Sequence, residues 1–209
     1  MESLANQCYV IFRQSIDDYH LSDNVDADLQ NPYGDDSMEA LLYLKNWVDA
    51  VQWHLEDLVR DPDIDSSRGM AIKRRIDRLN QQRTDLVERL DDHFCGRFSA
   101  DVLNVDARRN TESIGWAIDR LSILALKEFH MEVEMKRTDV EGAHLKLCAG
   151  RKEILLLQRV YLIESIDQLM TDMKAGKVIV KVYKQMKMYN DRDLNPVLYG
   201  KVTPLAARS

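Results

Sequence analysis

The segment from Thr111 to Arg137 constrains the fold of this chain most, because its pattern is helical and apolar on nearly every side. A helix with so little polar surface is usually central and mostly buried. The same segment nevertheless contains several polar or charged residues: Asp119, Arg120, Ser122, Lys127 and His130. Charges on a buried helix must be paired, hydrated in a cleft or used for binding. We therefore expect a central helix here, with other helices packed round it.

Four more segments have the apolar periodicity of amphipathic helices. Their apolar residues recur three or four positions apart over residues 3–20, 36–60, 65–90 and 141–174. Capping boxes predict where two of these helices begin, with Asp36 and Glu39 opening the second and Thr138 and Glu141 opening the last. Gly176 fits the end of the last helix. For the central helix, Asn110 or Thr111 is the predicted N-cap.

Alternating strand patterns are nearly absent, and only 8 glycines and 4 prolines interrupt 209 residues. Residues 22–37 are rich in Asp, Asn, Pro and Gly and predict a loop, while residues 94–110 lack periodicity and predict a connection. The predicted fold is therefore all-α, an antiparallel helical bundle of about five main helices over residues 1–176.

Residues 177–209 differ in composition, since lysines alternate there with valine, tyrosine and methionine. We expect a short amphipathic helix followed by an extended basic tail that packs back on the acidic bundle. An arm that binds RNA or a membrane surface is the alternative. The small number of lysines along the amphipathic stretch and the acidic balance of the chain favour packing.

Charge and composition narrow the classes of function. The net charge of −6 argues against nucleic acid as a partner. No apolar run approaches ~20 residues, so we expect no membrane span, and the first residues lack the basic region of a signal peptide. Three scattered cysteines without a C-x-x-C pattern predict reduced thiols, a cytoplasmic protein and no cysteine metal site.

Four runs of sequence are distinctive in their order: LLYLKNWVDAVQWHLEDLVRDP (41–62), IKRRIDRLNQQRTDLVE (72–88), NTESIGWAIDRLSILALKEFHM (110–131) and KVYKQMKMYNDRDLNPVLY (181–199). They resemble a bacterial family catalogued as domain of unknown function 4254, and the resemblance covers nearly the whole chain. It implies a bacterial, cytoplasmic, all-helical protein of similar length. Because the family has no established activity, the resemblance supplies no catalytic residues.

The charged residues of the central segment share one side of the predicted helix. At ~100° per residue, one arc that also holds Trp116 and Ile123 contains Glu112, Asp119, Arg120, Lys127, His130 and Glu134. The arc is either the exposed side of a largely buried helix, where ion pairs add only ~0.3–0.5 kcal/mol each, or the wall of a polar cleft. The first interpretation is the simpler one, although Trp116 and Ile123 favour the cleft.

Arg83 lies in the middle of an apolar stripe, and Arg159 has a similar place in the last helix. A guanidinium cannot lose its charge in a protein, so each must meet a carboxylate or an anionic ligand. Two structural ion pairs would satisfy them. Alternatively, the two arginines could clamp a phosphate or carboxylate together with residues of the arc. The predicted ligand-binding set is Arg83, Asp119, Arg120, Lys127 and Arg159.

His54 and His130 are the candidates for acid–base catalysis, because histidine can titrate near neutral pH. With Asp57 and Asp61, one and two turns further on, His54 could also join His130 in binding a metal. The Glu-x-x-His and H-E-x-x-H patterns of helical metal sites are absent, however. We therefore expect no metal and no cofactor, with the ring of His54 packed on Trp47 instead.

Two classes of function remain open. In the first, a helical protein has a polar interior site that binds an anionic small molecule, such as a phosphorylated metabolite or a nucleotide sugar. In the second, a non-catalytic interaction or structural protein uses the same charges as internal ion pairs. The sequence decides neither whether the chain is an enzyme nor what its oligomeric state is.

Overall fold

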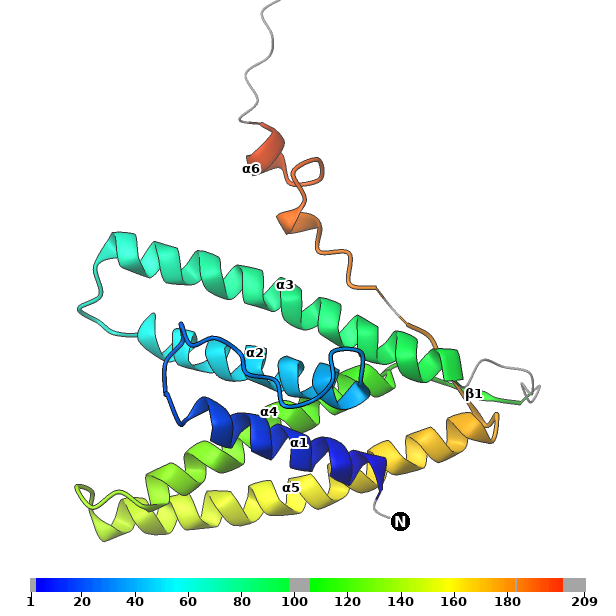
Figure 1. Cartoon of the computed structure of the whole chain (residues 1–209), viewed down its shortest axis with the longest axis horizontal. Helices are drawn as coiled ribbons and strands as arrows, with labels where there is room; N and C mark the ends of the chain where they lie inside the picture. Colours follow the sequence, from blue (N-terminus) through cyan, green and yellow to red (C-terminus); the bar gives the residue numbers. More distant parts are fainter. Residues whose placement is uncertain (1–2, 98–105, 183, 201–209) are drawn as a thin grey trace, which may run out of the picture.

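The computed structural model describes residues 3–97, 106–182 and 184–200 of the chain (Figure 1). Within these ranges, five long helices form a bundle: α1 (Leu4–Tyr19), α2 (Met38–Leu58), α3 (Ser66–Arg97), α4 (Ile114–Met135) and α5 (Gly142–Lys174). The predicted helical bundle is confirmed. No helix in the described ranges is long and apolar enough to cross a membrane.

Helix α4 is the centre of the bundle, as its apolar pattern predicts. It contacts each of the other four long helices. Its fully buried apolar residues are Ile114, Ile118, Leu121, Ala125 and Leu126. They pack in one core with residues of α1, α2, α3 and α5. Burial of apolar surface is the main favourable term in folding, so this core accounts for much of the stability of the bundle.

The start of α4 depends on α3 as well as on its own sequence. Ser113 is the N-cap and accepts a hydrogen bond from the Trp116 amide at 3.3 Å, so the predicted cap at Asn110 or Thr111 is wrong. The Ser113 hydroxyl also donates to Oδ2 of the buried Asp91 at 2.6 Å. Ser113 both caps α4 and binds a carboxylate of α3, whereas a cap at Asn110 or Thr111 would contact the helix alone.

Gly115 is required by the close approach of α3. Its amide donates to Asp91 Oδ1 at 2.6 Å. A Cβ at this position would lie 2.6 Å from the Val87 carbonyl oxygen and 2.8 Å from Asp91. Only glycine therefore allows the first turn of α4 to lie against the backbone of α3.

The two predicted capping boxes are also wrong in detail. Helix α2 is capped by Ser37, whose hydroxyl accepts from the Ala40 amide, rather than by the preceding Asp36. Helix α5 begins after Glu141, which makes no side-chain cap hydrogen bond. The predicted end of α5 is confirmed, because Gly176 has a φ of 64°, in the left-handed region that favours glycine.

Residues after α5 differ from the expected amphipathic helix. Strand β2 (Val178–Val180) pairs in parallel with strand β1 (Arg108–Asn110). The β-branched residues of β2 suit an extended backbone. A 3-10 helix η1 (Met188–Asn190) and a short helix α6 (Pro196–Tyr199) follow, and α6 lies beyond α3 in Figure 1. The end of the predicted tail, 201–209, and residues 98–105 of the connection expected at 94–110 lie outside the described residues. The first residues of that connection belong to α3, and its last three form β1.

Between β2 and α6, the described residues make three hydrogen bonds to α3, one of them from Asn190 Nδ2 to Gln81 Oε1 at 3.5 Å. Lys187 Nζ donates to the carbonyl oxygen of Asn80 at 2.7 Å, and the amide of Gln185 donates to Glu88 Oε1 at 3.1 Å. These contacts place the lysine-rich stretch beside α3.

Replacement of Gly115 by alanine is expected to lower the free energy of unfolding by about 1–3 kcal/mol, because the new methyl group overlaps the backbone of α3. Gly150→Ala is the matched control. Gly150 is exposed in α5 and a Cβ there meets nothing within 4 Å, so alanine is expected to stabilise the helix by ~1 kcal/mol. Denaturant unfolding measures both changes. Equal stability of the two variants would contradict the proposed close approach.

Candidate functional site

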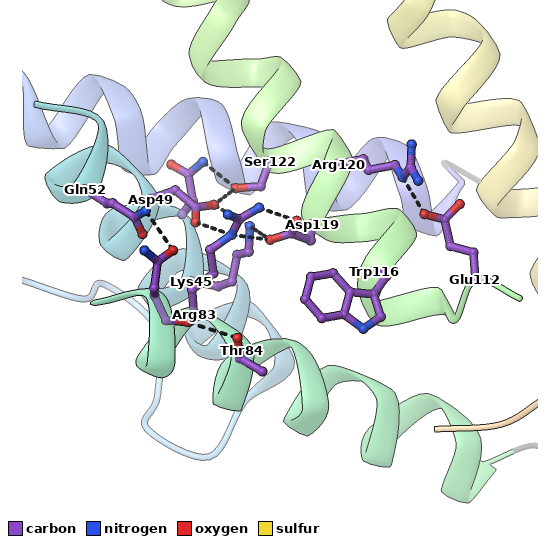
Figure 2. Close-up of polar contacts among 12 residues, drawn as sticks. Lys45, Asp49, Gln52, Arg83, Thr84, Glu112, Trp116, Asp119, Arg120 and Ser122 are labelled. Carbon is purple, nitrogen blue, oxygen red and sulfur yellow. Dashed lines mark hydrogen bonds and ion pairs between the residues drawn. The ribbon is translucent and has the colours of Figure 1, made fainter. Parts of the chain in front are cut away.

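A group of charged side chains lies inside the bundle, between α2, α3 and α4 (Figure 2). Lys45 and Asp49, one turn apart on α2, have fully buried side chains and form an ion pair. Lys45 Nζ also lies 2.8 Å from Oδ1 of Asp119 on α4. A buried lysine is tolerated only when its charge is compensated, and two carboxylates compensate it here.

Arg83 of α3 closes this group from the outer side. Its Nε and Nη2 donate to Oδ1 and Oδ2 of Asp119 at 2.8 and 2.5 Å, and its Nε lies 3.4 Å from Asp49 Oδ1. The guanidinium thus makes the two-pronged contact that arginine forms best with a carboxylate. The two cations and two carboxylates, which we call the interior charge network, balance one another: Lys45, Asp49, Arg83 and Asp119.

Neutral side chains complete the hydrogen bonds of the interior charge network. The Ser122 hydroxyl donates to Asp49 Oδ2 at 2.6 Å, and Asn46 Nδ2 donates to the Ser122 oxygen at 2.9 Å. The side chains of Asn46, Asp49 and Ser122 are all buried. Additional hydrogen bonds of this kind are what make a buried ion pair tolerable, because they replace lost contacts with water.

The two carboxylates differ in acidity. Burial raises the pKa of Asp49, and the neighbouring Asp119 raises it further, against the opposing effects of Lys45 and Arg83. Burial also acts to raise the pKa of Asp119, but Lys45 and Arg83 outweigh it and lower that pKa below the usual value. Asp119 is therefore the ionised partner of both cations, and Asp49 is the carboxylate more readily protonated.

A cavity of about 540 Å³ opens beside the interior charge network, between α3, α4 and α5. Four of the five predicted ligand-binding residues line it: Arg83, Asp119, Arg120 and Lys127. The side chain of Arg120 is 69% exposed and pairs with Glu112. Lys127 is exposed and forms no ion pair with any residue in the described part of the chain. Gln158, Tyr161 and Ser165 of α5 form the opposite wall.

Arg159, the fifth predicted residue, lies elsewhere. Its Nη1 is 2.8 Å from Oε2 of the fully buried Glu128 and donates to the Tyr9 hydroxyl at 2.7 Å. Its guanidinium also stacks over the Tyr9 ring, 4.7 Å from the centroid. Arg159 thus joins α5 to α1 and α4 through a separate ion pair, and the structure does not bring it together with Arg83.

Several smaller cavities adjoin the first. One at the start of α4, of about 400 Å³, shares Asp119 and Arg120 with it. Two more reach Trp53. One, of about 310 Å³, shares Lys127 and Gln158 with it and is otherwise lined mainly by apolar and aromatic groups, including Trp53 and Leu155. The other, of about 260 Å³, shares Arg83 and also reaches Trp53. Members of the charged arc of α4 therefore line more than one cavity.

The two candidate catalytic histidines lie together, with ring centroids 5.3 Å apart. The ring of His54 stacks on Tyr19 at 5.2 Å rather than on Trp47, and His54 Nε2 is 3.2 Å from His20 Nε2. The ring of His130 stacks on Trp53 at 4.7 Å.

Burial lowers the pKa of His130 to about 4, with further effects from His54 and His20, and burial likewise lowers the pKa of His54. His130 is therefore neutral at pH 7 rather than titrating there.

The comparison with known protein families gives one match. Residues 39–182 match the model of DUF4254, described as a protein of unknown function. The chain belongs to the DUF4254 family. The match spans α2 to α5 and the strand β2, and it includes the whole interior charge network. No curated protein and no solved structure matches the chain significantly.

Within the part of the chain that matches DUF4254, Lys45, Asn46 and Asp49 were not predicted as site residues. These polar residues of α2 lie in the run LLYLKNWVDAVQW, which is apolar on nearly every side. The same pattern led to the charges of α4 and could have led to these. His20 lies before the matched residues 39–182 and belongs to no sequence motif, so the sequence does not indicate that it lies beside His54.

Replacement of Asp119 by asparagine is expected to lower the free energy of unfolding by about 3–5 kcal/mol, because it leaves Lys45 and Arg83 with only one carboxylate. Glu112→Gln, which removes a carboxylate from an exposed ion pair of the same helix, is the control and should cost at most ~1 kcal/mol. Chemical denaturation followed by circular dichroism compares them. A loss for Asp119→Asn no larger than that of the control would show that the interior charges contribute little.

Proposed function

We propose that this protein binds a small anionic molecule, such as a phosphorylated metabolite or a nucleotide sugar, in the 540 Å³ cavity between α3, α4 and α5. The observation that carries the proposal is the charge of the lining. Three cationic residues and one carboxylate line the cavity, in a chain whose net charge is −6. A cavity whose lining has an excess of one sign of charge attracts ions of the opposite sign.

The cationic residues differ in how they are held. The side chain of Arg83 is 26% exposed, and Asp119 fixes it through Nε and Nη2. A guanidinium has five N–H donors, so donors remain for a ligand while its orientation is already set. Lys127 has no ion pair to break among the described residues, so it can contact an anion without losing another partner.

The adjoining 310 Å³ cavity suggests what else the ligand contains. It shares Lys127 and Gln158 with the first cavity and continues along α4 and α5 to Trp53 and Leu155. Both volumes fall within the usual range for small-molecule sites. An anionic group near Lys127 and a flat or apolar group near Trp53 would use both cavities, which favours a nucleotide-like molecule over inorganic phosphate.

His130 lines the second cavity, whereas His54 lines neither of the two. Of the two candidate catalytic histidines, His130 is therefore the one placed to exchange a proton with a ligand. Its low pKa makes its neutral ring an acceptor rather than a donor at pH 7.

The alternative is a non-catalytic interaction protein. It is supported by the ion pairs of Arg83 and Arg159, which satisfy both arginines without a ligand. Exposed apolar residues on α5 also support it: Leu147, Ile154, Leu157, Val160 and Tyr161. The two functions differ in whether any small anion binds at Lys127.

A thermal-shift screen with nucleotide sugars, sugar phosphates and inorganic phosphate is expected to reveal compounds that raise the melting temperature, because a ligand of the native state stabilises it by mass action. Lys127→Gln should weaken their binding about 10–100-fold, as the loss of one charge-assisted hydrogen bond predicts.

Lys136→Gln is the matched control, since Lys136 is an exposed lysine that follows the same helix and does not line the cavity. If no compound shifts the melting temperature at saturating concentration, or if both variants behave alike, the anion site is refuted and the interaction protein is favoured.

A further inference from the structure

Three of the five histidines of the chain meet in space although they are far apart in sequence. His20 directly follows α1, His54 belongs to α2 and His130 belongs to α4. Each offers one ligand atom, and the three atoms lie within 4.8 Å of one another. We call this group the histidine cluster. Because three separate parts of the bundle contribute to it, helical spacing within one element does not explain it.

His20 is oriented as a metal ligand would be. Its Nδ1 lies 2.7 Å from the carbonyl oxygen of Ile16, and a carbonyl can only accept, so this nitrogen carries the proton. Its Nε2 therefore presents a lone pair to the cluster. A hydrogen bond from the other ring nitrogen to a backbone carbonyl is the usual arrangement that orients metal-binding histidines.

The distance between the first two ligand atoms fits a metal. His54 Nε2 lies 3.2 Å from His20 Nε2. In a tetrahedral zinc site with Zn–N distances of about 2.0–2.1 Å, two nitrogen ligands are about 3.3 Å apart. A hydrogen bond between the two rings accounts for the same distance without a metal, so the third ring is needed to decide.

That third ring has a polar atom without a partner. Nε2 of His130 is buried and has no hydrogen bond to any described residue. Buried polar atoms are rarely left unpaired, because desolvation without a replacement contact is costly. The ring is partly buried and stacks on Trp53 at an interplanar angle of 7°, which fixes its plane. A metal bound at this nitrogen would supply the missing partner.

A carboxylate lies close enough to balance the charge of a cation. Asp23 Oδ1 is 3.9 Å from His20 Nε2 and 4.0 Å from His54 Nε2. Three imidazoles with a carboxylate or water in the fourth position form a common coordination set for zinc. Asp57 and Asp61, which the spacing along α2 offered as ligands, are not part of the cluster.

From this geometry we infer that His20, His54 and His130 form a binding site for one divalent transition metal that prefers imidazole ligands, of which Zn²⁺ is the best match. The expectation of no metal rested on residues of α2 and α4 alone. The addition of His20 completes a set of three nitrogen ligands. This inference does not depend on the proposed anion site, because Arg83, Arg120 and Lys127 are not part of the histidine cluster. A metal on His130 would, however, take the lone pair with which that ring could otherwise accept a proton from a ligand.

Equilibrium dialysis of the full chain, without a polyhistidine tag and after removal of metals by a chelator, tests the site with Zn²⁺ and Co²⁺ as probes. We expect one ion per chain, and for Co²⁺ the strong visible absorption of a tetrahedral nitrogen-ligated ion. Changes to outer groups that only orient ligands weaken metal binding about 10–100-fold. Replacement of a ligand in His20→Gln, His54→Gln or His130→Gln should therefore weaken it by at least about 100-fold.

His144→Gln is the matched control. His144 lies outside the histidine cluster. Its Nε2 is 3.0 Å from Glu134 Oε2 and 3.4 Å from Cys148 Sγ, so this variant tests whether a histidine beside other potential ligand atoms contributes to binding. This variant should bind as the parent does. Circular dichroism verifies that each variant is folded. Absence of binding by the parent, unchanged binding by His20→Gln, or an equal loss in His144→Gln would overturn the inference.

Discussion

The contact of Arg83 with Asp119 determines how α3 and α4 are placed, and through Lys45 and Asp49 it also includes α2. Apolar side chains pack in many arrangements, but a two-pronged arginine–carboxylate contact has a narrow geometry. Burial of four charges is expensive, and removal of any one leaves its partner uncompensated. We interpret the interior charge network as the set of contacts that selects one register of α2, α3 and α4 and thereby fixes the wall of the adjoining cavity.

Helix α4 carries so many charges because it has four helical neighbours. Asp119 meets α2 and α3, Glu128 meets Tyr9 of α1 and Arg159 of α5, and His130 faces the histidines of α1 and α2. Each polar residue therefore serves a different interface. Most of α4 is buried, so its exposed side holds only some of its charges, among them Arg120 and Lys127. Specific partners on the neighbouring helices must satisfy the others.

The sequence predicts the long helices well, because their periodicity reflects the core directly, and it predicts their starts less well. Several residues able to cap stand near each start, and contacts from other elements select among them, as Asp91 selects Ser113. The pairing of β1 with β2 could not be foreseen, since it joins segments far apart in sequence. Four predicted ligand-binding residues line one cavity because Asp119, Arg120 and Lys127 share the arc of α4, and Arg83 lies on the stripe of α3 that faces it. Arg159 lies elsewhere because it pairs with Glu128, a partner that helical periodicity does not reveal.

His130 connects the two polar regions of the cleft. Its ring belongs to the histidine cluster and also lines the cavity that continues to Lys127. Trp53 stacks on that ring and reaches the same cavity from α2. A divalent ion at the histidine cluster would add positive charge beside the 310 Å³ cavity, which adjoins the 540 Å³ cavity lined by three cationic residues. It would therefore favour the binding of an anion near Lys127. By thermodynamic linkage, an anion bound near Lys127 would raise the affinity of the histidine cluster for the metal by the same factor.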